Sequence, residues 1–577
     1  MKKSLTMAVL LSMTLTLGAC SSSSETPVNT PVSTPSNSAE ATGNTPDSSV
    51  LATDPETGLI PMADADKPVT FTIFVRDPGQ APAKDNPTLK KVTELTGVTM
   101  EFEFLVGDLE QKIGVMLAGG DYPDIIMGGS SRYVEGGALI PLENSLPNYP
   151  NLMQQYEKHM ENMKTAYGDG HLYYLEIYSV EQNNSPIFQN GGAGFWIQKD
   201  VLAEAGYPIP KTIDEYFQLI EDYQKKHPEI NGVKTIGFEI LTEGWRSFCL
   251  RNPAMHLMGN SNQGDVFVDY STNVASYYQI SDSAKTYYKK LNEMYHKGVI
   301  EAETLTQSYD QYIARLSTGA VLGMFDQRWN FANAENLIYA DGNFENTYVS
   351  VPIADPGVES VYLDAKSGIV NGTGGVGITV SCKDPERVLA FYDWLIQREV
   401  QDYLNWGVEG VDNIVTADGD KYLTPERLAI AKDVALNRDK TAATLLNYSP
   451  KRQGLYEDGA PCTPADSTAQ YFSELSEYDQ NFLKAYGIEY QAELLNPPYK
   501  HPDYYPVWGF VIEDASPAAI AKAKLEDLGM KHYPQLILCN PSEYNAKWDA
   551  FLADWKAAGV QPYLDEVNRQ LQVKVNK

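Results

Sequence analysis

The chain has 577 residues, of which 43% are hydrophobic and 11% aromatic, a composition typical of a well-packed globular protein with two or three domains. Its formal net charge of −31 argues against nucleic acid and anionic lipid head groups as partners. After Cys20 the only cysteines are Cys249, Cys382, Cys462 and Cys539, without a C-x-x-C pair. We expect free thiols, although spacing alone leaves a disulfide open.

The N-terminus has the pattern of a lipoprotein signal peptide. Lys2 and Lys3 precede the apolar stretch 5–17, which is too short for a membrane span of about 20 residues. The sequence LGAC at 17–20 is a lipobox pattern, which predicts a signal peptide at 1–19 and lipidation of Cys20. The acyl chains would anchor the protein in the bilayer. The alternative is an ordinary signal peptide with an incidental cysteine.

Residues 20–66 begin with the lipidated cysteine and continue with Ser, Thr, Pro, Asn and Ala. Such a segment buries too little apolar surface to offset its ordering entropy, so we expect a disordered tether. The folded protein is then expected at 67–577.

The first folded segment alternates strand and helix patterns. We expect strands at 69–75, 98–105 and 125–127, and helices from Asn86 to Thr96 and from Asp108 to Leu117. This β-α-β-α-β order predicts a parallel, doubly wound sheet.

The rest of the chain continues in the same style. A strand is expected at 194–197 and a helix at 199–205, and Thr212 with Glu215 forms a capping box for another helix. Long helical stretches are expected at 281–298 and 383–405, and two tail helices between 544 and 573 are split by Gly559.

Several segments, in their order along residues 68–573, resemble extracellular solute-binding lipoproteins of carbohydrate ABC transporters. The resemblance is to the family 1 type and its LipO-like group, similar to aldouronate- and alginate-oligosaccharide-binding proteins. The segments are LAGGDYPDII at 117–126, FWIQKDVL at 195–202, PKTIDE at 210–215, HKGVI at 296–300, KDPE at 383–386, WGVEGV at 406–411 and the stretch 548–559.

The resemblance implies an α/β, two-lobe periplasmic-binding-protein-like fold of type II, with a hinge, an interlobe cleft and extra C-terminal helices. The first lobe is expected at about 67–190 plus part of 330–420, and the second at about 191–330 plus most of 420–577. The implied protein is a monomer on the outer face of the membrane. It would deliver a carbohydrate to permease subunits without a cofactor.

One segment departs from the alginate-binding relatives, which carry a calcium loop after the PKTIDE helix. The equivalent stretch here is HPEINGVK at 227–234, where His227 and Ile230 replace oxygen ligands. Since Ca²⁺ needs six to eight oxygens, we expect no metal there.

A sugar site needs flat aromatic rings for the C–H faces and planar polar groups for the hydroxyls. We predict a ligand site made by residues that combine the two or lie at strand ends: Arg76, Trp245, Arg246, Asp326, Arg328, Trp329, Trp406 and Trp508. The alternative for any one tryptophan is packing in the core, which we favour for Trp196, Trp548 and Trp555.

The sequence gives little support for an enzymatic function. The seven histidines are never at metal-ligand spacing. The G-x-G-x-x-G match at 372–377 is followed by a strand pattern, whereas a dinucleotide site needs a helix. Two alternatives stay open: a surface glycoside hydrolase, which needs a carboxylate pair, and a peptide-binding lipoprotein.

Overall fold

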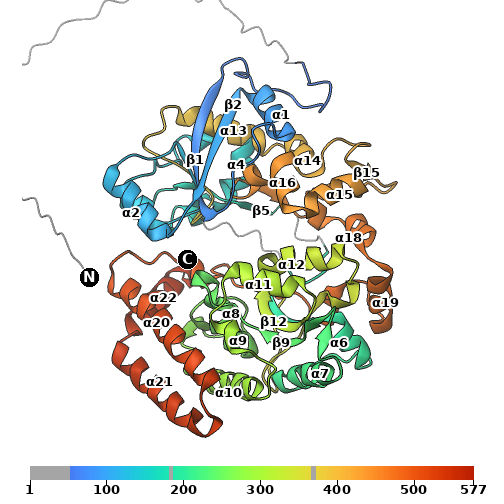
Figure 1. The fold of residues 1–577 in the computed structure, drawn as a ribbon. Helices are drawn as coiled ribbons and strands as arrows, with labels where there is room; N and C mark the ends of the chain where they lie inside the picture. The colour runs from blue at the N-terminus through green and yellow to red at the C-terminus, as the bar shows by residue number, and fades with distance from the viewer. Residues whose placement is uncertain (1–51, 181–185, 366–371, 577) are drawn as a thin grey trace, which may run out of the picture. The chain divides into compact units, whose positions relative to one another are not determined.

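The computed structural model describes residues 52–180, 186–365 and 372–576, with only the backbone for 178–180. In this part of the chain, two β-sheets, each covered by helices, form two lobes (Figure 1). The sheet of the first lobe has the order β2-β1-β3-β14-β4, in which β14 alone is antiparallel. Its strands are β1 Val69–Pro78, β2 Val98–Leu105, β3 Ile125–Met127, β4 Tyr174–Leu175 and β14 Val376–Ile378.

The helices of the first lobe begin and end where local signals place them. Helix α1 (Pro87–Thr96) is capped by Asn86, whose side chain accepts a hydrogen bond from the Leu89 amide, and it ends at Gly97 in the left-handed conformation. Asp108 caps α2 (Leu109–Gly119) in the same way. The lobe is completed by α4 Pro150–Tyr156, α13 Pro385–Leu395, α14 Arg398–Trp406, α15 Pro425–Lys432, α16 Val434–Lys440 and α17 Ala443–Leu446.

The sheet of the second lobe has the order β13-β6-β12-β9. Its strands are β6 Ala193–Gln198, β9 Ile236–Glu239, β12 Val321–Gln327 and β13 Tyr348–Val351, and β12 runs parallel to β9 but antiparallel to β6. The surrounding helices are α6 Lys199–Glu204, α7 Ile213–Lys226, α8 Phe248–Arg251, α9 Pro253–Leu257, α10 Asp282–His296, α11 Tyr309–Ser317, α12 Arg328–Ala340, α18 Thr468–Glu474 and α19 Glu477–Tyr486. The predicted capping box of Thr212 and Glu215 starts α7 and is confirmed.

Three C-terminal helices extend the second lobe: α20 Pro517–Leu538, α21 Tyr544–Ala558 and α22 Gln561–Val575. The two tail helices split by Gly559 are confirmed, and Trp548 and Trp555 lie in the core as expected. Helix α20 packs against α10, α21 and α22. The α/β fold class with extra C-terminal helices is therefore confirmed.

The helical stretch expected at 383–405 is divided into two helices. Helix α13 ends at Leu395, and Gln397 adopts φ −59° and ψ 144°, which breaks the helical path before α14. The Gln401 side chain donates to the Leu395 carbonyl at 2.8 Å and so satisfies a carbonyl that the break leaves open.

The prediction that the disordered tether runs to Asp66 is wrong for its last part. Leu59 and Met62 are buried in the first-lobe core, and the Met62 amide donates to the Leu95 carbonyl at 2.8 Å. The Trp394 indole also donates to the Ile60 carbonyl at 2.8 Å. The cause is the short apolar run LIPM at 59–62, which supplies the burial that the residues before it lack.

The other expected tether residues, the signal peptide and Cys20 fall within 1–51, outside the described residues. Among the described helices, none has the length and apolar character needed to span a membrane. Cys249, Cys382 and Cys539 are free thiols, as expected.

Replacing Leu59 by alanine tests whether the segment before β1 belongs to the folded unit. Leu59 is 3% exposed, so Leu59→Ala is expected to lower the free energy of unfolding by about 2–4 kcal/mol. Urea unfolding followed by circular dichroism measures it. The matched control is Ile60→Ala, because Ile60 is 54% exposed and should cost little. Equal effects of the two substitutions would show that this segment does not pack as described.

Candidate ligand-binding site

The carboxyl edge of the second sheet brings two distant tryptophans together. Because β9 and β12 are parallel, the segments that follow them leave the sheet at the same edge. After β9 the chain forms η3, a short 3-10 helix at Gly244–Ser247 that carries Trp245, and after β12 it enters α12, which carries Trp329. Figure 1 shows α11 and α12 on the side of the second lobe that faces the first lobe.

These two tryptophans are stacked on each other. Their ring centroids lie 5.7 Å apart at an interplanar angle of 19°, and the Phe248 ring lies 6.1 Å from each. Phe248 is buried, whereas Trp245 is 58% and Trp329 50% exposed. We call Trp245, Trp329 and Phe248, with the adjacent Arg246 and Tyr309, the aromatic platform. Large exposed aromatic area of this kind is typical of a binding surface.

Arg246 joins the stack as a cation. Its guanidinium lies 4.6 Å from the Trp245 ring and 4.0 Å from the Tyr309 ring, distances suited to cation–π attraction. Its Nε donates to Asn330 Oδ1 at 3.0 Å. Within the described part of the chain, no carboxylate lies at ion-pair distance from Arg246, so its outer N–H groups remain available to a ligand.

Asp326 lies beneath the platform, and its contact with a ligand stays a prediction. The residue is 0% exposed, and its carboxylate accepts hydrogen bonds from the Tyr312 hydroxyl at 2.7 Å and from Asn330 Nδ2 at 3.0 and 3.1 Å. Burial raises the pKa of Asp326 to about 6, although these donors oppose the rise. In the described structure, hydrogen-bond donors of the protein itself therefore enclose the Asp326 carboxylate.

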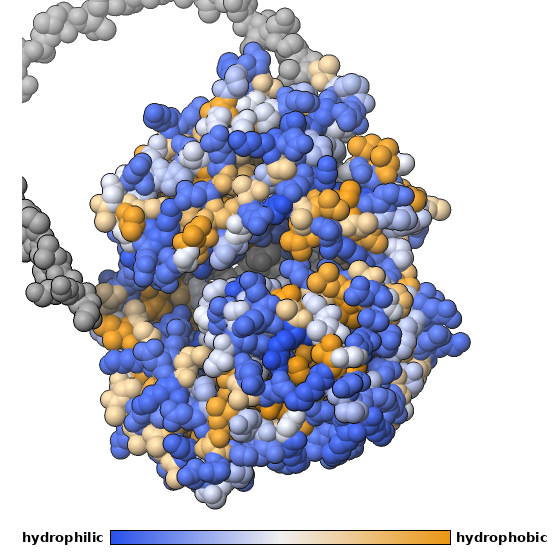
Figure 2. Space-filling view, in the orientation of Figure 1, coloured by the Kyte–Doolittle hydropathy of each residue, from blue (hydrophilic) through white to orange (hydrophobic). Residues whose placement is uncertain are grey.

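A cavity of about 550 Å³ lies beside the start of α12, within the range of about 300–1,000 Å³ that is typical of ligand sites. It is bordered by the segment 186–192 before β6, the segment 362–364, α12 and the segment 463–475. Figure 2 shows the surface hollowed between the two lobes. Arg328 lines this cavity, whereas the next residue, Trp329, belongs to the platform.

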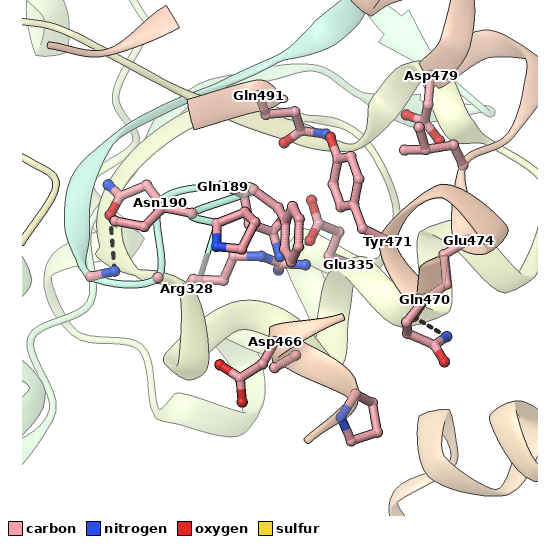
Figure 3. Close-up of a pocket in the computed structure, with 18 of the residues that line it drawn as sticks. Gln189, Asn190, Arg328, Glu335, Asp466, Gln470, Tyr471, Glu474, Asp479 and Gln491 are labelled. Atoms are coloured by element: carbon pink, nitrogen blue, oxygen red, sulfur yellow. Dashed lines mark hydrogen bonds and ion pairs between the residues drawn. The ribbon is translucent and has the colours of Figure 1, made fainter. Parts of the chain in front are cut away.

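Polar side chains of several kinds line the cavity (Figure 3). They include the amides of Gln189, Asn190, Gln470 and Gln491 and the carboxylates of Glu335, Asp466, Glu474 and Asp479. On one wall, Tyr471 stacks on Phe188 with centroids 4.9 Å apart. Amides and carboxylates beside aromatic rings are the groups that bind polyhydroxylated ligands.

The cations of the cavity are each held by a carboxylate. Lys199 Nζ lies 2.5 Å from Asp479 Oδ1 and also donates to Thr347 Oγ1 at 2.9 Å. Arg328 pairs with Glu335, and Lys432 Nζ lies 2.9 Å from Glu474 Oε2. These pairs fix the walls of the cavity, so the prediction that Arg328 binds ligand directly stays a prediction.

The structure does not bring the remaining predicted residues to the platform. Arg76 lies on β1 of the first lobe, where its Nη1 donates to the Gly129 carbonyl at 2.9 Å. Trp508 is 54% exposed and packs beside Gly264 on a separate loop. Trp406 is 1% exposed and its indole donates to the Pro461 carbonyl, so it lies in the core of the described structure, and its contact with a ligand stays a prediction.

The glycine-rich segment at 372–377 leads into strand β14, as expected, and not into a helix. Its amides are already occupied, because the buried Glu176 carboxylate accepts hydrogen bonds from the Gly372 amide at 2.8 Å and the Thr373 amide at 3.2 Å. An internal carboxylate therefore fills the place that a phosphate would need.

Sequence reasoning missed Phe248, Tyr309 and most of the cavity residues. Asn330 follows Asp326, the acid at the end of the strand, by four residues. This spacing, which brings two side chains together at the start of a helix, is the signal that could have identified Asn330. No local signal marks Gln470, Tyr471 or Gln491, because their position depends on how a distant segment returns to the second lobe. Among the described residues, no group of three or more potential ligand side chains is arranged to hold a metal ion.

A comparison with protein-family models places the chain in a family. The model of the family described as bacterial extracellular solute-binding protein matches residues 88–407, which is more than half of the chain. The chain therefore belongs to the bacterial extracellular solute-binding protein family.

Two curated relatives are similar over long stretches. The chain is 22% identical over 502 residues to the fructooligosaccharide ABC transporter substrate-binding protein FusA of Streptococcus pneumoniae, covering 82% of this chain and 85% of FusA. It is 22% identical over 357 residues to lipoprotein LipO of Bacillus subtilis, covering 57% of this chain and 64% of LipO. The solved structure of S. pneumoniae FusA in complex with kestose matches with a TM-score of 0.63 at 19% identity, covering 88% of this chain and 100% of that chain.

Breaking the buried ion pair of the cavity wall should destabilise the second lobe. Burial raises the pKa of Asp479, but the Lys199 charge and hydrogen bonds from Lys199 and Ser476 outweigh it, so the net pKa is lowered. The stabilisation is therefore complete above the unfolded pKa of about 4 and is lost as the pH falls through the folded value. Asp479→Asn leaves the Lys199 ammonium buried and is expected to cost about 3–5 kcal/mol.

Thermal unfolding at pH 7 measures this cost. The double variant Lys199→Met/Asp479→Leu removes both charges and is expected to recover most of the stability. An Asp479→Asn protein as stable as the parent would mean that the pair is not buried as described.

Proposed function

We propose that this protein is the substrate-binding component of an ABC importer and captures a carbohydrate, most simply an oligosaccharide, between its two lobes. The observation that carries the proposal is the stacked, half-exposed pair Trp245 and Trp329 beside a cavity lined by amides and carboxylates. FusA and LipO support it as relatives, the first by its substrate and the second as a lipoprotein.

The two parts of the site suit the two surfaces of a sugar. The exposed indole faces and edges of Trp245 and Trp329 accept C–H faces, and the cavity amides and carboxylates accept hydroxyl groups in bidentate arrangements. Residues 328 and 329 are consecutive on α12 but serve the cavity and the platform respectively. A ligand that uses both therefore has to extend around the start of this helix, which favours several linked sugar units over a monosaccharide.

The mechanism is capture without chemistry. A ligand that touches both lobes stabilises the arrangement in which they are closed around it, and only the added contacts supply the energy. A micromolar affinity corresponds to about −8 kcal/mol, which stacked rings and several hydrogen bonds provide. The two alternative functions are a glycoside hydrolase and a peptide-binding lipoprotein. A hydrolase would cleave the sugar that the proposed receptor returns intact, and a peptide-binding lipoprotein would not bind the sugar.

The N-terminus would hold this receptor at the outer face of the membrane. In the proposal, residues 1–19 are removed, Cys20 carries the acyl chains, and the segment up to the folded part at Leu59 acts as a tether. The lobe ranges expected from the sequence, action as a monomer and delivery to permease subunits belong to the same proposal.

Melting of the purified protein against a panel of oligosaccharides tests the assignment. The panel contains neutral fructo-, gluco- and xylo-oligosaccharides and acidic uronate oligosaccharides, because Arg246 has no carboxylate partner in the described chain. A melting temperature that rises with ligand concentration, with the sugar recovered intact, supports the receptor. A cleaved sugar supports the hydrolase, and no shift with any sugar contradicts carbohydrate binding.

The platform itself is tested by Trp329→Ala. Loss of one stacked ring is expected to weaken binding of the active oligosaccharide by about tenfold to a hundredfold, measured by titration calorimetry. The matched control is Trp508→Ala, which removes an indole of similar exposure, 54% against 50%, from a separate loop. Equal losses in both variants would contradict the platform as the sugar site.

Cys20→Ser tests the anchor. The variant lacks the thiol that takes the lipid, so it is expected to leave the membrane fraction and to lose incorporation of labelled palmitate. Cys382→Ser, which removes a free thiol in the folded part, serves as the control. Membrane retention with undiminished palmitate in the Cys20→Ser protein would refute lipidation at this position.

A further inference from the structure

We infer that Asp326 is a positioning residue, whose buried carboxylate orients Asn330 and, through it, holds Arg246 and Trp245 in the geometry that stacks Trp245 on Trp329. The inference deepens the proposed function, on which its consequence for ligand binding rests.

The first step is the contact between Asp326 and Asn330. Asn330 is 1% exposed, and its Nδ2 donates to both oxygens of the Asp326 carboxylate, at 3.0 and 3.1 Å. A carboxylate only accepts hydrogen bonds, so it requires the NH₂ group of the Asn330 amide to face it. The amide oxygen of Asn330 must then point the other way.

The second step runs from Asn330 to the platform. Asn330 Oδ1 accepts from Arg246 Nε at 3.0 Å, and the Asn330 carbonyl accepts from the Tyr309 hydroxyl at 2.8 Å. Arg246 lies over the rings of both Trp245 and Tyr309. Asn330 therefore connects three separate elements, η3 through its side-chain amide, α11 through its main-chain carbonyl and α12, on which it lies. Asp326 decides the orientation of the side-chain amide.

Among the titratable groups in contact with one another here, Asp326 is the one whose charge changes between pH 5 and 7. The titratable side chains that touch it are Cys249, with Sγ donating at 3.3 Å, and Tyr312, and burial raises the pKa of both well above their ordinary values. Tyr309 and Arg246 lie one contact further out, and Glu243 accepts from the Tyr309 amide at 2.7 Å. The pKa of Asp326 is raised to about 6, so its carboxylate changes charge within the range from pH 5 to 7.

Asp326→Asn is the informative variant because it keeps the shape and removes one of the two acceptor oxygens that face Asn330 Nδ2. The new amide places an NH₂ group where that oxygen was, against the NH₂ group of Asn330, so the orientation of Asn330 is no longer fixed by a carboxylate. If Asn330 turns, its own NH₂ group meets Arg246 Nε–H, and two donors face each other. The variant is therefore expected to release Arg246 and the stacked pair even when the second lobe stays folded.

The stacked tryptophans provide a readout that needs no ligand. Two indoles at 5.7 Å couple in the ultraviolet circular dichroism spectrum, and the difference between the parent and Trp329→Phe isolates this signal. In the Asp326→Asn background the same difference is expected to fall to less than half. In the parent the signal is expected to weaken as the pH falls through about 6, and in Asp326→Asn this pH step should vanish.

The matched control is Asp200→Asn. Asp200 lies on α6 of the same lobe and its carboxylate accepts from the Tyr223 hydroxyl at 2.6 Å, away from the platform. This control should leave both the tryptophan signal and its pH step unchanged. A purely structural role for Asp326 would lower the melting temperature of Asp326→Asn but leave the tryptophan signal and the pH step intact, and that result overturns the inference.

Should Asp326→Asn fail to fold, Asn330→Leu removes the same connection without placing two donors against each other. It is expected to lose the tryptophan signal as well. For the oligosaccharide that shifts the melting temperature of the parent, affinity should fall about tenfold in Asp326→Asn. A panel without any binder contradicts the proposed function alone, because the spectroscopic test of Asp326 still gives its answer.

Discussion

The arrangement of the site depends on the parallel pairing of β9 and β12. Because the register aligns Phe238 with Gly323 and Glu239 with Met324, both strands end at the same edge, and the segments that follow must leave the sheet together. Trp245 and Trp329 are 84 positions apart in the sequence, yet this pairing stacks their rings. The buried carboxylate at the end of β12 then ties the two segments to each other through Asn330.

The same edge accounts for the cavity. Strand β6 is antiparallel to β12, so the segment that precedes β6 lies next to the segment that follows β12. The Arg328 amide donates to the Gly192 carbonyl at 3.4 Å, which places the two cavity walls side by side. The strands of the second sheet thus position both the polar cavity and the aromatic platform.

Local elements of this protein were predictable because their signals are local. Caps at Asn86, Asp108 and Thr212 and the glycine at 559 place helix ends without reference to the rest of the fold. Strands β2 and β3 were expected at their observed bounds. The break between α13 and α14 was not, because no proline or glycine marks it.

The site was predictable only in part. Trp245, Arg246 and Trp329 combine an aromatic ring with a charge at a strand end, and the structure brings these three together. Asp326 and Trp406 shared that composition but are enclosed, since a motif carries no information about which side chains the fold covers. No local pattern predicts that the cavity is lined by Gln470, Tyr471 and Gln491. The segment that carries them is distant in the sequence from the other cavity residues.

Charge adds a constraint on what the site accepts. Lys199, Arg328 and Lys432 each have a carboxylate partner at the cavity, whereas Arg246 at the platform has none in the described chain. Hydroxyl groups are therefore suited to the cavity, and any anionic group of a ligand would be placed at the platform.

The most direct test of this account is a crystal structure of the protein with the oligosaccharide that raises its melting temperature most. The account predicts an intact sugar with the C–H face of one ring against Trp245 or Trp329 and hydroxyl groups hydrogen-bonded to the cavity amides. A sugar bound elsewhere with the platform empty, or a cleaved sugar in the cavity, would contradict it.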